Sequence, residues 1–512
     1  MRTKGREMES NQAPDDRRHV FVIFGGTGDL ARRKLIPSMY DLVTETDIGD
    51  DCVIVGVGSG DFDDTTYREW ARDALRDAGV SETDLDSWND GNVHFARVDR
   101  DAVSFEPLRH RIETIEADHG LPGNRAFYLA IPPSSFPGAI ERLGAAGLSE
   151  SPGWTRLVIE KPFGTDLAST HELNELVHRW FGESQVYRID HYLGKETVQN
   201  LLAFRFSNPM FESVWTRDRV ESVEITVAED LGIGTRAGYY ETAGALRDMV
   251  QIHLTQVLAL VAMEPPNSVD AEQIRNEKVK AIEAIAPIAP ERVVFAQYEA
   301  GSVNGESVPA YRDEDGVAPD SRTPTFVGIR LEIDTWRWQG VPFYLRSGKR
   351  LPRRLTQIAV TFRRPPLCIF HGCRDGCDVD PNVLLITLQP DEGFTLRFNV
   401  KAPGEPMIIE TQALRFSHDD VYGRLPEAYR ALIQDIIEGD QTLFVRADEV
   451  EASWRLYDPI LDCDADIHPH EAGTWGPAVL NLSLIHISEP TRPRRQSRMA
   501  SSACKGGGGG GG

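Results

Sequence analysis

The feature that most constrains the fold is a short apolar run that ends in a cluster of glycines near the start of the chain. His19-Val-Phe-Val-Ile-Phe24 is rich in β-branched and aromatic side chains, and Gly25-Gly-Thr-Gly28-Asp-Leu-Ala31 leads from it into a helix-like segment that starts at Leu30. A strand, a glycine turn and a helix in this order are typical of a dinucleotide-binding unit, in which a pyrophosphate faces the helix N-terminus. The spacing is G-x-x-G-x-x-A, so a glycine-rich turn that binds no nucleotide is the alternative.

Further strands and helices alternate through the first part of the chain. Apolar runs at Cys52–Gly56, Ala126–Ile131 and Arg156–Glu160 predict strands, and Thr66–Ala78 and Phe105–His119 have helical patterns. This alternation predicts a parallel, doubly wound sheet with helices on both faces.

Beyond about residue 200 the strand-like runs follow one another without regular helical spacers. They are Val220–Val227, Thr325–Trp338, Gln357–Arg363 and Val383–Leu388. Such a succession predicts a large, mostly antiparallel sheet, and the helical patterns Ala243–Ala262 and Arg424–Ile437 are expected to cover one of its faces. The predicted fold is therefore an α/β Rossmann dinucleotide-binding domain at 19–198, followed by an α+β substrate and oligomerisation domain at 199–481.

Both ends of the chain depart from this pattern. Residues 1–18 form a polar lead-in with no apolar signal segment. From about Leu482 the sequence reads SLIHISEPTRPRRQSRMASSACK and ends in seven glycines. We expect 482–512 to be a non-native tail that resembles a translated adapter, with a genuine flexible tail as the alternative. Its arginines are not interpreted as a binding patch.

Charge and composition exclude several classes of protein. The net charge is −24 over 512 residues, which disfavours nucleic acid and anionic membranes as partners. The acidic excess is typical either of a GC-rich genome or of a salty cytoplasm. No apolar stretch reaches the length of a membrane span. Six scattered cysteines do not form a disulfide framework, so a cytoplasmic setting is predicted. Any phosphate site must then be a local basic pocket.

The end of the second strand leaves the choice of nucleotide open. An acidic residue there would bind the ribose hydroxyls of NAD, whereas an arginine would bind the 2′-phosphate of NADP. The strand ends in Ser59, which can donate to a phosphate but cannot neutralise it, and Asp61 nearby favours NAD. Arg32 and Arg33 on the first helix are candidates for the missing positive charge.

Two segments bring basic groups toward the expected ligand crevice. Lys161 follows the strand Arg156–Glu160 and precedes Pro162, at the strand end that faces ligands in a doubly wound sheet. A solvated loop lysine is the alternative. In RIDHYLGKE, residues 188–196, the spacing of His191, Tyr192 and Lys195 suits one helical face, and these groups suit a phosphate monoester. A surface helix with ion pairs is the alternative.

A third segment, RDMVQIH, places Asp248 and His253 among apolar residues of a probable helix. Oxidation of a hydroxyl requires a base, and a histidine oriented by a carboxylate suits that role. Asp248 is the first candidate for that carboxylate, and a structural core histidine is the alternative. Cys368–Cys377, with His371, has irregular spacing for zinc. We predict no metal.

Eight segments in order resemble the glucose-6-phosphate dehydrogenase family, from about His19 to Pro477. They are GGTGDLARRK, FYLAIPP, EKPFG, RIDHYLGKE, RAGYYETAGALRDMVQIH, RWQGVPFYLRSGKRL, QPDEG and LFVRADEVEASW. The resemblance implies that His253 is the general base and Asp190, rather than Asp248, its carboxylate partner. It implies a phosphate clamp of His191, Tyr192 and Lys195, and sugar ligands at Lys161, Glu229, Asp248, Lys349 and Arg354. It also implies nucleotide contacts at Gly25, Thr27, Gly28, Asp29, Leu30, Ser59 and Lys161.

The same resemblance implies the reaction and its setting. Glucose 6-phosphate would be oxidised to 6-phosphogluconolactone with hydride transfer to NADP, possibly NAD, as the first step of the oxidative pentose phosphate pathway. A homodimer or homotetramer is implied. The family usually carries arginine where this chain has Ser59, which weakens the expectation of NADP. The rivals are a glucose–fructose oxidoreductase type of enzyme, which lacks RIDHYLGKE, and an inactive regulator that binds sugar phosphates.

Overall fold

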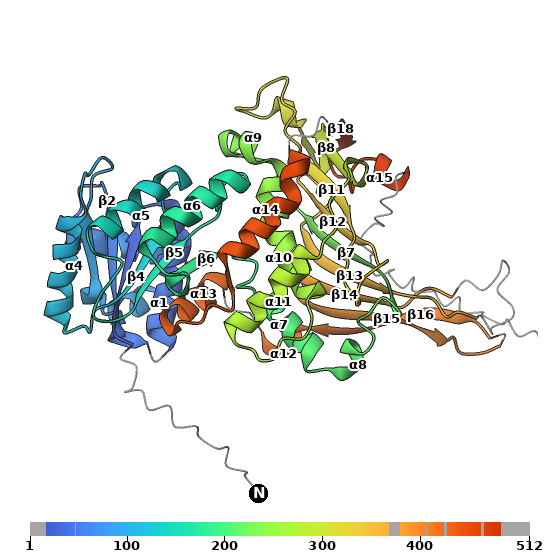
Figure 1. Cartoon of the computed structure of the whole chain (residues 1–512), viewed down its shortest axis with the longest axis horizontal. Coiled ribbons are helices and arrows are strands. Elements are labelled where there is room, and N and C mark those ends of the chain that lie inside the picture. Colours follow the sequence, from blue (N-terminus) through green and yellow to red (C-terminus); the bar gives the residue numbers. More distant parts are fainter. Residues whose placement is uncertain are drawn as a thin grey trace, which may run out of the picture.

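The computed structural model describes residues 17–46, 48–367, 379–405, 407–423, 427–461 and 465–482. The chain forms two lobes, each built around one large β-sheet (Figure 1). The zinc alternative at Cys368–Cys377 lies outside the described residues, as do the predicted tail beyond Leu482 and most of the polar lead-in. Among the described helices, none combines the length and the hydropathy needed to cross a membrane.

The first sheet has the strand order β17-β6-β5-β4-β1-β2-β3. Its parallel strands are β1 (His19–Phe24), β2 (Cys52–Gly58), β3 (Val93–Arg97), β4 (Asn124–Leu129), β5 (Thr155–Ile159) and β6 (Val186–Ile189), and β17 (Phe444–Val445) is antiparallel to β6. The predicted parallel sheet is therefore confirmed. The strand order reverses beside β1, and this is where doubly wound sheets bind their ligands.

Helices cover both faces of this sheet. They include α1 (Ile36–Glu45), α2 (Asp64–Asp77), α4 (Glu106–His119), α5 (Phe136–Ala145) and α6 (Leu167–Trp180). Val20 and Val22 of β1 belong to one apolar core, while Phe21 and Ile23 belong to the other. Because alternate side chains of a strand point to opposite faces, a central strand between two helix layers must be apolar throughout. This explains the unbroken run His19–Phe24.

The second sheet has the order β16-β15-β14-β13-β7-β12-β11-β8-β18. Its strands are β7 (Val220–Ala228), β8 (Val293–Glu299), β11 (Phe326–Leu331), β12 (Phe343–Gly348), β13 (Leu355–Phe362), β14 (Val383–Gln389), β15 (Gly393–Lys401), β16 (Ile409–Ser417) and β18 (Ile467–Glu471). The pairs β7–β12 and β8–β18 are parallel and the others antiparallel, which confirms the predicted α+β domain. The strand predicted at Thr325–Trp338 stops at Leu331, because Trp338 instead anchors a loop by donating its indole N–H to the Ala262 carbonyl at 2.7 Å.

The helical pattern predicted at Ala243–Ala262 is interrupted rather than continuous. Gly244, with φ of +55°, kinks α9 (Ala237–Ala245) by adopting a conformation that favours glycine. The following segment, η6 (Leu246–Leu254), is π-helical, and α10 (Thr255–Ala262) is a regular α-helix. Short π-helical segments occur frequently at functional sites. With α7 (Glu196–Phe206) and α11 (Ala271–Glu283), these helices lie beside the second sheet (Figure 1).

The helix predicted at Arg424–Ile437 forms as α13 (Ala428–Glu438), but the expectation that it covers the second sheet is wrong. Leu432 and Ile436 pack in the same core as Phe21 of β1. Arg156 of β5 donates to the Ile437 carbonyl at 2.7 Å and so satisfies the C-terminus of the helix. Residues 428–445 therefore complete the first lobe, although they lie far beyond the predicted boundary at 198.

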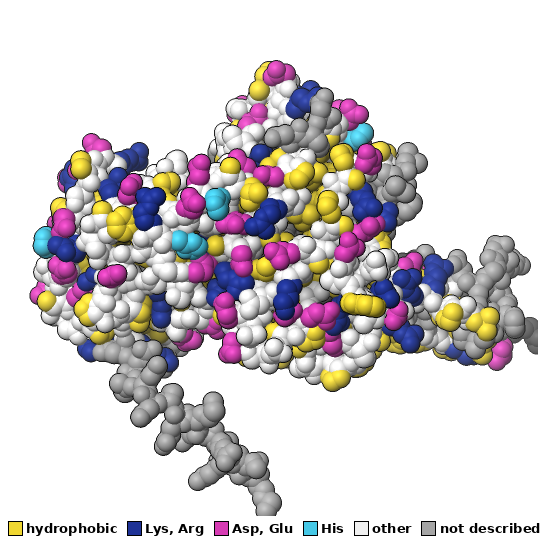
Figure 2. Space-filling view, in the orientation of Figure 1, with side chains coloured by type: hydrophobic (Ala, Val, Ile, Leu, Met, Phe, Trp, Pro, Cys, Tyr) yellow, Lys and Arg dark blue, Asp and Glu magenta, His cyan; other side chains and the backbone are white. Residues whose placement is uncertain are grey.

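The remaining elements are α14 (Ala447–Leu461), which runs along the junction of the lobes (Figure 1), and several short pieces. The short pieces are α3 (Glu82–Ser87), α8 (Pro209–Glu212), α12 (His418–Tyr422), α15 (Val479–Leu482), β9 (Gly301–Val303) and β10 (Glu306–Val308). Over the face shown in Figure 2, acidic and basic side chains are interspersed on both lobes. The acidic excess therefore does not gather on one part of that face.

Candidate active site

Strand ends from both sheets bring polar side chains to the junction of the lobes. Lys161 follows β5 and Asp190 follows β6, and these two strands are parallel neighbours. Glu229 follows β7 and Lys349 follows β12, which are also parallel neighbours. Because the carboxyl ends of parallel neighbours lie side by side, each pair of residues is close in space. The π-helical segment η6 adds His253 to the group.

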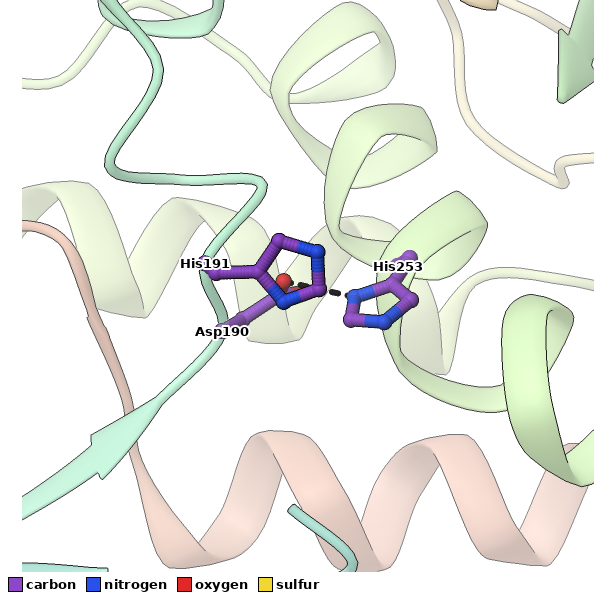
Figure 3. Close-up of side chains that lie close together, drawn as sticks. All are labelled: Asp190, His191 and His253. Carbon is purple, nitrogen blue, oxygen red and sulfur yellow. Dashed lines mark hydrogen bonds and ion pairs between the residues drawn. The ribbon is translucent and has the colours of Figure 1, made fainter. Parts of the chain in front are cut away.

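The central contact is a buried hydrogen bond between Asp190 and His253 (Figure 3). Nδ1 of His253 lies 2.6 Å from Oδ1 of Asp190, and their side chains are 2% and 0% exposed. Burial would raise the pKa of Asp190, but the charge and the hydrogen bond of His253 lower it to about 2. A carboxylate only accepts hydrogen bonds, so Nδ1 carries the proton and Nε2 keeps its lone pair. The structure thus places Asp190, and not Asp248, on Nδ1.

Burial also lowers the pKa of His253 below its ordinary value, although Asp190 acts in the opposite direction. At neutral pH the imidazole is therefore unprotonated on Nε2. A histidine in this state can accept a proton from a hydroxyl, and Asp190 then stabilises the imidazolium that forms. The arrangement is suited to general base catalysis.

The RIDHYLGKE segment does not form the helix face that we predicted for His191, Tyr192 and Lys195. Residues 191–194 form a turn, and α7 begins only at Glu196. The turn itself is what brings the rings together. Tyr192 stacks on His253 with 4.5 Å between ring centroids, and His191 meets the same ring edge-on at 4.7 Å. Burial, followed by the charge of His253, lowers the pKa of His191 to about 3, so this imidazole is neutral.

Lys161 lies on the other side of His253. Its ammonium nitrogen is 3.2 Å from Nε2 of His253 and 3.1 Å from Oδ1 of Asp248, and it also donates to the Asp248 backbone carbonyl. Tyr239 donates its hydroxyl to the same Asp248 carboxylate oxygen at 3.3 Å. Burial opposes ionisation of Asp248, but the charges of Lys161 and Lys349 lower its pKa to about 2. Asp248 is therefore an ionised acceptor beside the base.

Two cations converge a short distance away. Lys195 and Arg354 both donate to the side-chain oxygen of Gln389, at 2.6 Å and 3.1 Å. Burial, and then the charge of Arg354, lower the pKa of Lys195 to about 8. Two like charges that share a neutral acceptor form a site that suits an anion. We did not predict Gln389 from the sequence, although the QPDEG motif contains it.

Glu229 and Lys349 form an ion pair at the ends of β7 and β12. The Lys349 ammonium lies 2.7 Å from Oε2 of Glu229 and 5.1 Å from the centre of the Tyr240 ring. The Lys349 side chain is 3% exposed, whereas that of Glu229 is 33% exposed. The carboxylate is thus the accessible member of the pair, and it can accept hydrogen bonds from sugar hydroxyls.

The glycine turn after β1 fits a bound dinucleotide. Gly25 has φ of +78°, and a Cβ there would lie 2.3 Å from the Ala130 carbonyl oxygen. Gly28 closes the turn by donating its N–H to the Gly25 carbonyl at 2.8 Å. Backbone is helical by Leu30, so the N-terminal N–H groups of this helix lie at the carboxyl end of β1. Thr27 belongs to the same turn, and Asp29 is the first helical residue after it. This is the donor arrangement that binds a pyrophosphate.

Two of the charged residues that bear on the choice between NAD and NADP are already ion-paired within the protein. Arg32, a candidate for the 2′-phosphate, pairs with Asp77 at 2.6 Å. Asp61, the residue that favours NAD, pairs with Arg97 at 3.0 Å. Arg97 comes from β3, where its Cα is the register partner of Gly58 of β2. Sequence reasoning missed Arg97, since only the sheet register brings it to the end of the second strand.

Asp190, His191 and His253 also form the only group of three potential metal ligands found among the described residues. The 2.6 Å contact between Asp190 and His253 is a hydrogen-bond distance that leaves no room for a cation between these two atoms. The Lys161 ammonium faces the remaining nitrogen of His253. A hydrogen-bonded base explains these contacts better than a metal site.

Comparison with known proteins agrees with this geometry. A family model described as the glucose-6-phosphate dehydrogenase NAD binding domain matches residues 22–200, and the model of the C-terminal domain matches residues 202–486. The chain is 44% identical to glucose-6-phosphate 1-dehydrogenase 2 of Mycobacterium tuberculosis, with 89% of this chain and 91% of that protein covered. It is 42% identical to glucose-6-phosphate 1-dehydrogenase of Bacillus subtilis, with 92% and 96% covered.

Solved structures give the same result. A glucose-6-phosphate dehydrogenase in complex with glucose 6-phosphate aligns with a TM-score of 0.85 at 33% identity, over 94% of this chain and all of that one. A glucose-6-phosphate 1-dehydrogenase from Mycobacterium avium aligns with a TM-score of 0.79 at 34% identity, with the same coverage. With both domain models matched in order and relatives this similar over most of its length, the chain belongs to the glucose-6-phosphate dehydrogenase family.

Proposed function

We propose that this protein oxidises glucose 6-phosphate to 6-phosphogluconolactone, the first step of the oxidative pentose phosphate pathway. The observation that carries the proposal is the buried Asp190–His253 hydrogen bond, which leaves a basic Nε2 between a cationic anion site and the end of β5. When bound, NADP or NAD supplies the nicotinamide ring that accepts the hydride. His253 takes the proton of the C1 hydroxyl, and Asp190 stabilises the resulting imidazolium.

The other residues of the site orient the substrate so that its C1 hydroxyl faces Nε2 of His253. The 6-phosphate is bound by Lys195 and Arg354, together with His191 and Tyr192. The carboxylates of Glu229 and Asp248 accept hydrogen bonds from the sugar hydroxyls, and the Lys349 ammonium donates to them. In this structure the Lys161 ammonium faces Nε2 of His253. When the substrate binds, its C1 hydroxyl replaces the ammonium as the partner of Nε2. The ammonium of Lys161 then lies beside both sugar and nucleotide. Such positioning supplies much of the rate acceleration.

A direct absorbance assay tests the proposal. The protein is mixed with glucose 6-phosphate or glucose and with NADP or NAD, and reduced nicotinamide is followed. We expect turnover with the phosphate ester. Turnover with glucose but not with its phosphate would favour the glucose–fructose oxidoreductase type instead, and no turnover with any pair would contradict the proposal. The ratio of the rates with NADP and NAD measures the preference of this protein for one nucleotide over the other.

The phosphate clamp gives a prediction for high pH. Because the pKa of Lys195 is lowered to about 8, its positive charge is present below that pH and is lost above it. We expect kcat/KM for glucose 6-phosphate to fall about tenfold per pH unit above this pKa. The phosphate is already a dianion throughout this range, since its second pKa is near 6.

Lys195→Arg is the matched control for this prediction, because a guanidinium stays charged at every pH used. The variant is expected to lose the high-pH fall in kcat/KM while keeping substrate binding. A fall that persists unchanged in Lys195→Arg would assign it to another group.

We further propose that the protein is a cytoplasmic homodimer that pairs through β15 and β16. These strands extend from the body of the second lobe (Figure 1), and hydrophobic side chains are exposed toward their tip (Figure 2). Ile408 is 50% exposed and Leu414 63% exposed. A hollow of about 1050 Å³ between α7 and β14–β16 is lined mainly by apolar side chains. Exposed apolar surface of this kind is typical of an interface, and a second copy of the chain would cover it.

Replacement of Leu414 by Asp tests the homodimer. A charge in the centre of an apolar interface is not compensated, so we expect the mass from light scattering to change from two chains to one. Val103→Asp is the control, because Val103 is 95% exposed and lies outside this surface. A wild-type protein that is already monomeric would contradict the proposal.

A further inference from the structure

Helix α14 makes hydrogen bonds to both halves of the active site without contributing a side chain to it. At its start it is bonded to Asn174 of α6 and to Glu183. Both of these residues accept hydrogen bonds from Arg188 of β6, the strand that ends directly before Asp190. Further along, it reaches η6, which contains His253, and α10, which follows it. Asp190 and His253 belong to different lobes, so some element must set the distance between them.

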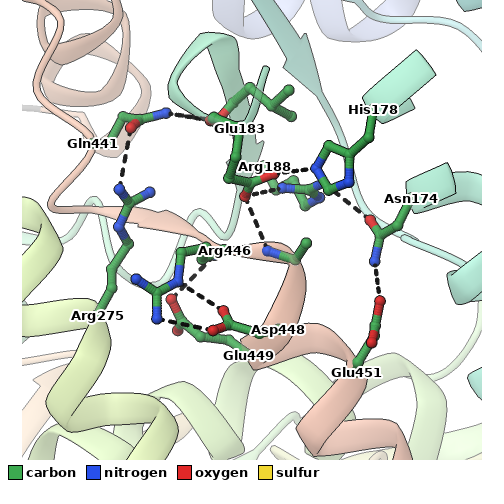
Figure 4. Close-up of polar contacts among 12 residues, drawn as sticks. Asn174, His178, Glu183, Arg188, Arg275, Gln441, Arg446, Asp448, Glu449 and Glu451 are labelled. Atoms are coloured by element: carbon green, nitrogen blue, oxygen red, sulfur yellow. Dashed lines mark hydrogen bonds and ion pairs between the residues drawn. The ribbon is translucent and has the colours of Figure 1, made fainter. Parts of the chain in front are cut away.

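The contacts toward β6 form a partly buried polar network (Figure 4). Arg188, two residues before Asp190 and 2% exposed, donates to Glu183 at 2.7 Å and to Asn174 at 3.0 Å. Glu183 also accepts the backbone N–H of Ala447, the first residue of α14, at 3.0 Å. Asn174 donates to Glu451 of α14 at 2.9 Å. Two bridges, both through the Arg188 guanidinium, therefore join the base of the Asp190 loop to this helix.

The contacts of α14 near His253 lie two residues before it and two residues after it in the sequence. Ser453 of α14 donates its hydroxyl to the backbone carbonyl of Gln251, two residues before His253. Tyr457 of α14 and Thr255, two residues after His253, share a hydrogen bond of 2.9 Å between their hydroxyls. These groups are buried, where hydrogen bonds are strong and a missing partner is costly.

We propose that α14 sets the Asp190–His253 distance, and that Glu183 and Asn174 are positioning residues for the general base. The proposal rests on the proposed function, since it concerns the same base. The bond between Asp190 and His253 crosses from one lobe to the other. Helix α14 is linked to Arg188 near Asp190 through Asn174 and Glu183, and directly to Gln251 and Thr255 near His253. A displacement of about 1 Å at a catalytic group can lower the rate by roughly 100-fold.

The pH profile is the readout that a purely structural role would not change. His253 is faced by a defined set of titratable groups, namely Asp190, His191, Tyr192, Lys161 and Asp248. Of these, Asp190 makes the hydrogen bond to Nδ1 and raises the pKa of His253. If Asp190 moves away, the pKa of His253 falls, and the low-pH limb of kcat/KM moves to lower pH.

Glu183→Ala and Asn174→Ala each remove one bridge to α14. We expect kcat to fall roughly 10- to 100-fold in each, KM for glucose 6-phosphate to change less than kcat, and the low-pH limb to shift downward. Glu183→Gln keeps an acceptor for Arg188 and for the Ala447 N–H, so it is expected to recover most of the loss. Rates are normalised to the folded fraction measured by circular dichroism.

The matched control is Lys278→Met. Lys278 of α11 lies 2.8 Å from Glu449 of α14, and both side chains are buried. This change damages the same helix at its contact with α11, and leaves the bridges through Asn174 and Glu183 in place. We expect a comparable loss of thermal stability, with kcat per folded enzyme and the low-pH limb unchanged. If Glu183→Ala and Asn174→Ala behave like Lys278→Met, or if Lys278→Met shifts the limb as they do, α14 is not a specific positioning element.

A second measurement separates this proposal from the proposed function. In protein labelled with ¹⁵N-histidine, the Nδ1 proton of His253 that is bonded to Asp190 gives a downfield NMR signal, assigned by its absence in His253→Asn. Loss of that signal in Glu183→Ala and Asn174→Ala, but not in Lys278→Met, supports positioning whether or not the protein oxidises glucose 6-phosphate. An unchanged signal in both variants would contradict it.

Discussion

Replacing His253 with Asn is expected to lower kcat by roughly 10⁴-fold, at the upper end of what general acid–base catalysis contributes. The imidazole is buried, and Asp190 fixes its proton on Nδ1, so Nε2 carries the lone pair that takes the proton of the C1 hydroxyl. Asn has a similar volume and can still hydrogen-bond to Asp190. The dissociation constant for glucose 6-phosphate, from calorimetry, should therefore change little.

The pH profile supplies an independent check on His253. Burial lowers its pKa, and the base acts only when unprotonated. The low-pH limb of wild-type kcat/KM is therefore expected below the ordinary histidine pKa of about 6.5, and the remaining activity of His253→Asn should lack this limb. His470→Asn, a buried histidine of β18, controls for the stability cost of the exchange. A large loss of substrate binding in His253→Asn would make His253 a ligand rather than the base.

Asp190→Asn is expected to lower kcat by roughly 10²- to 10⁴-fold. An amide can donate to Nδ1, which would move the proton of His253 to Nε2 and block the base. It also removes the charge that stabilises the imidazolium. Because Asp190 raises the pKa of His253, the low-pH limb should move to lower pH. Asp248→Asn is the informative comparison, since it should raise KM without moving that limb as far. If Asp248→Asn shifted the low-pH limb as far as Asp190→Asn does, Asp248 rather than Asp190 would be the carboxylate partner of His253.

The sequence predicted the elements whose pattern is local. The boundaries of β1 and α4 could be read within a residue, because an apolar strand that ends in a glycine turn and a periodic helix need no distant partner. The RIDHYLGKE and RDMVQIH segments identified the right residues but not their geometry. A turn at residues 191–194 and the π-helical η6 depend on packing between lobes, which no single-segment period encodes.

Other features depended on contacts between distant residues. Gln389 accepts a hydrogen bond from Lys195, although the two residues are 194 positions apart in the sequence. Arg97 reaches Asp61 only through the register of β2 and β3. The location of α13 was predicted wrongly because an amphipathic helix indicates that one face is buried but not against what. These misses share one cause: the partner lies elsewhere in the sequence.

The return of residues 428–445 to the first lobe has a consequence for biosynthesis. The sheet edge at β6 and the core around Phe21 are closed by β17 and α13, which are translated long after the rest of that lobe. At roughly 5–20 residues per second, the nascent chain waits on the order of tens of seconds with an open strand edge and an uncovered apolar face. Such a chain offers a natural binding surface for chaperones during translation.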